Sequence, residues 1–160
     1  MKFIAGVAAT IALLTLSAVA AINTGNVTDG IRLRAEAPAI KIPTGEPVVV
    51  KGSLTNERAG KIALGTTDPL GGFRIVIVDA KGHSVRMNKS GRDLVKLVHR
   101  SKQELAPGEK IEQSLWLSSL YNLKKPGKYK ITMTHDVDAS NGLGKETVKS
   151  NTVSVWISKR

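Results

Sequence analysis

Apolar and polar residues alternate with a period of two through most of this chain, and this pattern constrains its fold more than any other feature. The longest example spans residues 128–137, where one set of alternate positions holds Tyr129, Ile131, Met133, His135 and Val137. Successive side chains of a β-strand point to opposite faces, so such a segment offers one face to a core and one to solvent. The chain is therefore expected to consist mainly of strands.

Seven segments show strand character, and Gly, Pro or Asn residues bound most of them. They span residues 31–36, 48–54, 61–65, 73–78, 111–117, 128–137 and 153–158. The connections are mostly too short for the crossover helices that a parallel sheet needs. The expected fold is therefore all-β: an antiparallel immunoglobulin-like β-sandwich of about seven strands over residues 31–160.

A few stretches depart from simple alternation. Residues 73–78 are apolar on both faces, which is typical of a strand that is central or covered on both sides. Residues 83–87 follow a turn and are expected to form its hairpin return. Residues 93–99 fit either one or two helical turns or a strand, and residues 118–123 fit a 3₁₀ turn between strands.

The N-terminus has the pattern of a secretory signal peptide. Lys2 precedes an apolar run over residues 3–21, and Ala18-Val19-Ala20 near its end has the small-x-small spacing of a cleavage site. We therefore expect a signal peptide over residues 1–20, a flexible leader over residues 21–30, and a secreted or periplasmic protein. A retained membrane anchor is the alternative, because the run approaches the roughly 20 residues that a span requires.

The chain is strongly basic, and its cations are unevenly distributed. Lys and Arg total 24 against 13 Asp and Glu, a formal charge of +11. One candidate binding group lies between residues 83 and 102 with a single acid, Asp93, and comprises Arg86, Lys89, Arg92, Lys96, Arg100 and Lys102. A second group comprises Lys124, Lys125, Lys128 and Lys130. Such groups fit an anionic polymer, a membrane surface or an acidic protein, and also a merely solvated surface.

Two tryptophans are further candidates for a binding surface. Trp116 and Trp156 both fall on the polar side of their strands' alternation. If those faces are exposed, the two rings can form a patch of the kind found at interaction hot spots. The alternative is that each ring covers an edge of the sandwich. Nucleic acid is an unlikely partner, because the chain is expected to be exported and has only 4% aromatic residues for base stacking.

The usual catalytic and metal-binding patterns are missing from the sequence. The chain has no Cys, no His-Glu-x-x-His helix and no Gly-x-Ser-x-Gly elbow, so we expect no metal site, no cofactor and no enzymatic activity. Asp136, Asp138 and Ser140 match the start of a calcium loop, but the sixth and twelfth positions do not. His135 is expected in the core, and Tyr129 in a structural tyrosine corner.

One stretch carries a family resemblance. Leu105-Ala106-Pro107-Gly108-Glu109 is followed by Leu117-Ser118-Ser119-Leu120-Tyr121-Asn122-Leu123 and then by Pro126-Gly127-Lys128-Tyr129. This resembles a bacterial secreted immunoglobulin-like module, similar to the non-catalytic sandwich segment of some deuterolysin-type metallopeptidases. The chain is also broadly similar to small bacterial peptidase inhibitors. The resemblance implies a β-sandwich that binds another protein.

We therefore expect a non-enzymatic secreted or periplasmic module that binds another secreted or envelope protein. Peptidase inhibition and a pro-domain-like regulatory role are the specific forms that the resemblance implies. The alternative is an envelope-associated protein that binds a polyanion through its basic clusters.

Overall fold

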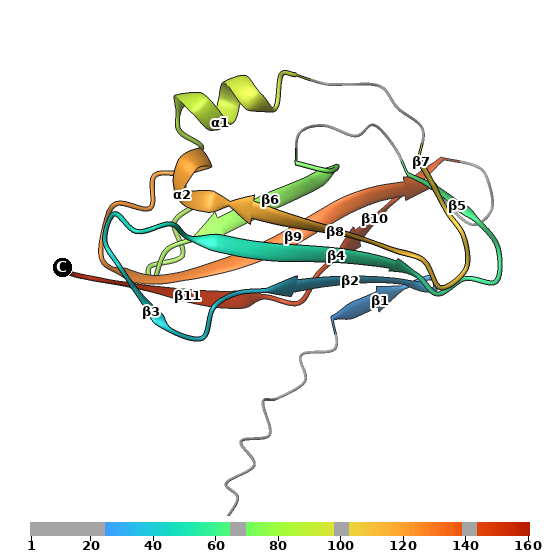
Figure 1. The fold of residues 1–160 in the computed structure, drawn as a ribbon, viewed down its shortest axis with the longest axis horizontal. Coiled ribbons are helices and arrows are strands. Elements are labelled where there is room, and N and C mark those ends of the chain that lie inside the picture. The colour runs from blue at the N-terminus through green and yellow to red at the C-terminus, as the bar shows by residue number, and fades with distance from the viewer. Residues whose placement is uncertain (1–24, 65–69, 98–102, 139–143) are drawn as a thin grey trace, which may run out of the picture.

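Two β-sheets pack face to face in the computed structural model, which describes residues 25–64, 70–97, 103–138 and 144–160 (Figure 1). Sheet A has the order β1-β2-β4-β8, formed by β1 (Asn26–Thr28), β2 (Ile31–Glu36), β4 (Val49–Asn56) and β8 (Lys110–Trp116). All of its pairings are antiparallel. The expected signal peptide over residues 1–20 lies outside the described residues.

Sheet B is organised around one long strand, β9 (Gly127–Asp138). Four strands pair with β9: β5 (Ile62–Leu64), β6 (Phe73–Val78), β10 (Lys145–Lys149) and β11 (Val153–Ser158). The sheet is completed by β7 (Gln103–Leu105), which pairs with β5, and by β3 (Lys41–Pro43), which pairs in parallel with β11. The expected all-β antiparallel sandwich is confirmed, but the described residues form eleven strands rather than about seven, and the β3–β11 pair is parallel.

The core lies between the two sheets and is built from the apolar positions of the alternating segments. Leu33, Leu54, Ile131 and Met133 are fully buried there. Sheet A approaches sheet B closely at Gly52, where an added Cβ would lie 2.9 Å from the sulfur of Met133 and 3.2 Å from the ring of Phe73. A side chain at this position would push the sheets apart, so the core requires glycine here.

Buried asparagines connect the two sheets. Beyond the end of β1, the amide of Asn151 takes the place of a neighbouring strand: its oxygen accepts from the Ala35 N–H at 2.9 Å, and its nitrogen donates to the Ala35 carbonyl at 3.0 Å. At the end of β4, Asn56 donates to the Leu105 carbonyl on β7 at 3.0 Å. These side chains satisfy backbone groups that would otherwise be buried without partners.

Two short helices cover one end of the sandwich. Helix α1 (Lys89–Leu94) is capped by Asn88 and rests on α2 (Leu117–Leu120) through Gly91, where an added Cβ would lie 2.5 Å from the Leu120 carbonyl oxygen. Neither helix in the described ranges reaches the length and apolar character that crossing a membrane requires. Helix α1 thus begins before the expected stretch of residues 93–99, and α2 takes the place of the expected 3₁₀ turn.

Three expectations need correction. The flexible leader over residues 21–30 is wrong for its second half, because Asn26–Thr28 form β1 and pair with β2. Strand β6 pairs with β9 and is neither central nor covered on both sides, and Val76 on its outer face is 52% exposed. Residues 83–87 return along β6 only in part: Ser84 forms an antiparallel bridge with Val78 and the Val85 N–H donates to the Ile77 carbonyl at 2.8 Å, but no full strand forms.

Both tyrosines have structural roles at turns. The Tyr129 hydroxyl donates to the Lys125 carbonyl at 2.7 Å, which confirms the expected tyrosine corner. The Tyr121 hydroxyl donates to the Ile75 carbonyl on β6 at 3.0 Å, and burial raises the pKa of Tyr121 to about 12. The two rings therefore fix the segment 121–129 against sheet B.

Replacing Asn151 with alanine should destabilise the fold. The substitution leaves two buried backbone groups of Ala35 without partners, so the free energy of unfolding should fall by about 2–4 kcal/mol. Asn122→Ala removes an exposed amide and should change it by less than about 0.5 kcal/mol. Urea unfolding followed by circular dichroism measures both; equal effects of the two substitutions would show that Asn151 does not connect the sheets.

Alkaline pH should destabilise the protein partly through Tyr121. Its pKa is about 12 in the folded chain against 10.0 in the unfolded chain, so between these values the unfolded chain loses the proton first and stability falls as pH rises. Tyr121→Phe should flatten this decline, while costing about 1 kcal/mol at neutral pH from the lost hydrogen bond. Denaturant unfolding across this pH range tests it, and an unchanged slope in the variant would contradict it.

Candidate functional site

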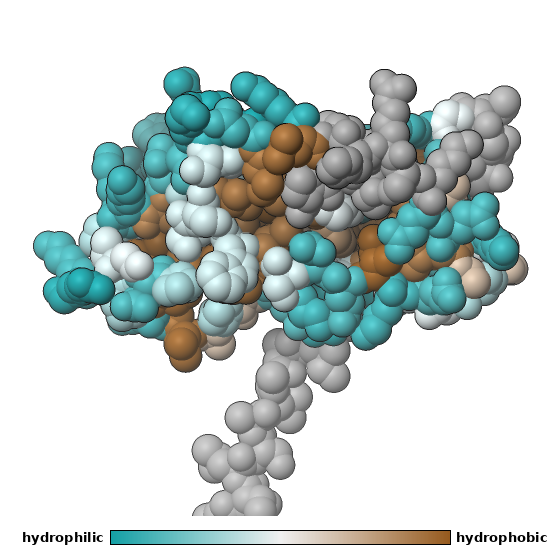
Figure 2. Space-filling view, turned by 45° about the horizontal axis from the view of Figure 1, so that its top comes forward, coloured by the Kyte–Doolittle hydropathy of each residue, from teal (hydrophilic) through white to brown (hydrophobic). Residues whose placement is uncertain are grey.

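The first basic group lies around α1, and much of its charge is used locally. Lys89 and Lys96 share Asp93, at 2.7 Å and 3.7 Å, and the Arg92 guanidinium donates to the Met87 carbonyl at 2.7 Å. Arg86 is exposed just before the helix, whereas Arg100 and Lys102 lie outside the described residues. Hydrophilic side chains cover this end of the molecule (Figure 2). The part of this group that the structure describes is therefore partly neutralised.

The outer face of sheet A carries cations that are paired with acids. Its ion pairs are Arg32–Glu57 at 2.6 Å, Arg34–Glu36 at 3.1 Å, Lys51–Glu112 at 2.9 Å and Lys110–Glu112 at 3.1 Å. Hydrogen bonds from Lys51 and then Lys110 hold the pKa of Glu112 below its usual value. Trp116 projects from this face with 60% of its surface exposed and lies opposite Val49. Sheet A therefore presents a nearly neutral surface.

The outer face of sheet B differs in its charge. Trp156 on β11 is 49% exposed, and the Lys128 ammonium lies 5.4 Å from the centre of its ring. Lys128 is the partner of Trp156 on β9, Lys41 is its partner on β3, and Lys130 lies opposite Ser154. Partners in neighbouring strands project on the same side of a sheet. We call this surface the lysine face: Lys41, Lys128, Lys130 and Trp156.

The three lysines of the lysine face form no ion pair with any residue in the described ranges. Farther along β9, Asp136 is occupied by Arg74 and also accepts from the Thr147 hydroxyl at 2.8 Å. Two more exposed lysines, Lys145 and Lys149, continue the face on β10. The positive charge that remains available on the sheets is thus concentrated on sheet B.

The two tryptophans do not form one patch. Trp116 lies on the outer face of sheet A and Trp156 on the outer face of sheet B, so the sandwich separates them. Sequence alternation correctly places both on polar faces, but it cannot show which sheet each strand joins. Lys41 was missed as a neighbour of Trp156 for the same reason, because β3 and β11 are more than one hundred residues apart in sequence.

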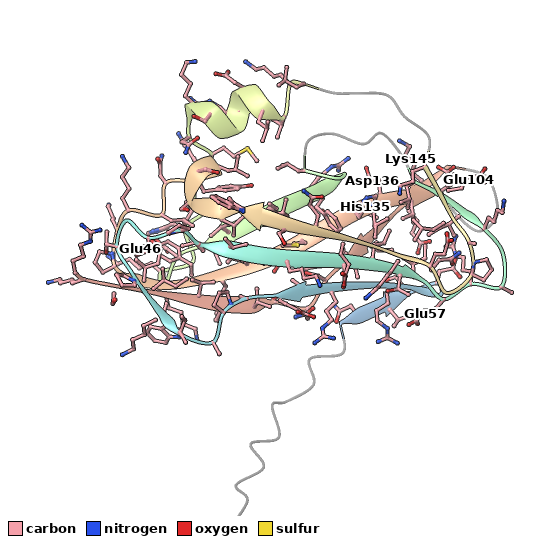
Figure 3. The ribbon with its side chains drawn as sticks, viewed as in Figure 1. Glu46, Glu57, Glu104, His135, Asp136 and Lys145 are labelled. Carbon is pink, nitrogen blue, oxygen red and sulfur yellow. The ribbon has the colours of Figure 1, made fainter. Side chains whose placement is uncertain are left out.

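The described residues offer no arrangement typical of catalysis or metal binding. His135 is 2% exposed, as expected for a core histidine, with its ring edge-on to Phe73 at 5.3 Å and packed against Gly72. Its neighbour Asp136 points to the opposite side of β9 (Figure 3). Within these residues, no group of three or more His, Cys, Asp or Glu could hold a metal ion. Ser140 of the calcium-like spacing lies outside them.

Comparisons with known proteins support the fold. The C-terminal domain of Wzt superposes with a TM-score of 0.51 at 9% identity, over 85% of this chain and 78% of that one. Structural genomics target SoR45 gives 0.48 at 12% identity, over 82% and 90%, and a PapD-like domain of human CEP192 gives 0.45 at 11%, over 82% and 87%. No family model matches the chain, and no curated protein matches it. At this identity the likeness to Wzt shows a shared β-sandwich and nothing about activity.

Lys128 should contribute to stability through its contact with the Trp156 ring. Lys128→Ala removes a cation–π contact at an exposed site and should lower the free energy of unfolding by about 0.5–1 kcal/mol. Lys130→Ala removes a neighbouring lysine on the same face and should have a smaller effect. A double-mutant cycle with Trp156→Leu, which removes the aromatic ring, isolates the contact by urea unfolding; a coupling energy of zero would contradict it.

Proposed function

We propose that this protein is a non-enzymatic exported module that binds an acidic surface of another secreted or envelope protein through the lysine face. The contrast between the two outer faces carries the proposal. Sheet A pairs its cations with acids, whereas Lys41, Lys128 and Lys130 lie around an exposed tryptophan and have no such partner among the residues that the structure describes. Carboxylates of a partner would pair with the lysines of sheet B, as the chain's own glutamates pair with the cations of sheet A.

The chemistry of the lysine face suits protein recognition. An exposed tryptophan buries a large area at little cost in conformational entropy, and such residues dominate the energy of many interfaces. Lys128 holds the Trp156 ring from one side, which limits its motion before binding. The lysines attract an acidic surface at long range and therefore raise the association rate.

The sequence supports the partner class and the location. The pattern from Leu105 to Tyr129 resembles the sandwich segment of peptidases and is expected to belong to a protein-binding module. Peptidase inhibition or a pro-domain-like regulatory role is the form of binding that we propose on this basis. The signal-peptide pattern over residues 1–20 supports a secreted or periplasmic location.

Binding to a panel of secreted metallo- and serine peptidases tests the proposal. Trp156→Ala should weaken binding by about tenfold or more, as expected for an interface hot spot. Trp116→Ala is the matched control: it removes a ring that is at least as exposed from the charge-paired face and should change affinity by less than about twofold. Raising the salt concentration should slow association.

Two outcomes would contradict the proposal. Equal loss of binding in the two tryptophan variants would place the interface elsewhere. No binding to any peptidase, together with salt-sensitive binding to anionic vesicles or an acidic polysaccharide that depends on Trp156, would favour the polyanion alternative. That alternative uses the same unpaired lysines and differs only in the partner.

A further inference from the structure

Beside the lysine face, two turns line a cavity of 310 Å³ that is open to solvent. One turn follows β6 and contributes Asp79, Ala80, Lys81 and His83, and the other precedes and begins β9 and contributes residues 125–129. The volume is at the lower end of the range for ligand sites, roughly 300–1,000 Å³, so it fits a side chain rather than a large cofactor. Lys128 connects the two surfaces, because it lines this cavity and also contacts the Trp156 ring.

Positive charge exceeds negative charge around this cavity. Lys81, Lys125 and Lys128 line it and form no ion pair within the described residues, and Asp79 is the single acid among the lining residues. The Asp79 carboxylate is already committed to its own turn, since it accepts from the Lys81 N–H at 2.8 Å and from the His83 N–H at 2.9 Å. These bonds, led by that from His83, keep the pKa of Asp79 below its usual value.

The walls of the cavity are fixed before any ligand binds. The hydrogen bonds of Asp79 close the first turn, and the Tyr129 hydroxyl ties the second turn through the Lys125 carbonyl. Lys81 and Lys125 belong to different turns, so each turn contributes a cation to the lining of the cavity. Preformed sites lose less entropy on binding than flexible ones.

We infer that this cavity is a subsite for a single carboxylate, the side chain of an Asp or Glu on the protein partner. The inference rests on the proposed function and names the group that the partner inserts beside Trp156. We take the ligand to be a carboxylate because the proposed partner is a protein, whose surface anions are the side chains of Asp and Glu, and phosphate is the competing anion in the test.

Titration of the purified protein with small probes tests the inference. N-acetyl-glutamate α-amide presents the side-chain carboxylate alone, N-acetyl-glutamine α-amide is its neutral counterpart, and inorganic phosphate is the competing anion. We expect saturable shifts of the backbone amide NMR signals of residues 79–83 and 125–129 with the first probe only, with affinity in the millimolar range typical of one weakly held group.

A matched pair of variants identifies the lysines responsible. Lys81→Gln with Lys125→Gln should weaken carboxylate binding by about fivefold or more, since each removes one charge from the cavity. Lys51→Gln with Lys110→Gln removes two lysines that Glu112 holds on the opposite face and should leave binding unchanged. Unchanged amide signals away from the substitutions confirm that both variants remain folded.

Several results would overturn the inference. These are equal shifts with the neutral probe, tighter binding of phosphate, no shifts at all, or equal effects of the two double variants. The failure of the proposed function is distinguishable: carboxylate binding in the cavity without binding of any peptidase would contradict the proposed function alone. Peptidase binding that survives loss of Lys81 and Lys125 would contradict the subsite alone.

Discussion

Sheet B depends on one constraint, the uninterrupted alternation of the twelve-residue strand β9. Four other strands take their register from it, β11 and β10 along one edge and β6 and β5 along the other. Its apolar positions, Ile131 and Met133 among them, meet sheet A where Gly52 leaves room. A shift of β9 by one residue would exchange its two faces, so the core and the outer surface are specified together.

The same alternation determines the composition of the surface. Because Tyr129 and Ile131 must face the core, Lys128 and Lys130 must face outward, on the side where β11 places Trp156. Parallel pairing of β3 then adds Lys41 beyond the ring. The lysine face is thus a consequence of strand pairing, and it is distinct from the basic group around α1, where Asp93 compensates two of the cations.

Features that depend on local patterning can be predicted from the sequence, whereas features that depend on strand neighbours cannot. Alternation predicts the core positions of β9, the burial of His135 and the outward orientation of both tryptophans. It cannot show that Trp116 and Trp156 lie on opposite sheets, nor that Lys41 lies beside Trp156, because pairing between distant strands is decided by packing. For the same reason, the apolar character of β6 wrongly suggests a central strand. Among the strands, β6 pairs with β9, and the Tyr121 hydroxyl donates to the Ile75 carbonyl on its other edge.

Neighbouring strands lie roughly 4.8 Å apart, so the backbones that carry Lys41 and Lys128 are separated by roughly 10 Å across β11. This separation is close to the Debye length at physiological ionic strength, about 8 Å, so solvent ions screen much of the repulsion between the two lysines. An acidic group placed over Trp156 between them lies nearer to each lysine than they are to each other. Its attraction to both is therefore screened less than their mutual repulsion, so the charge pattern is tolerated in the free protein and suits the acidic partner that we propose.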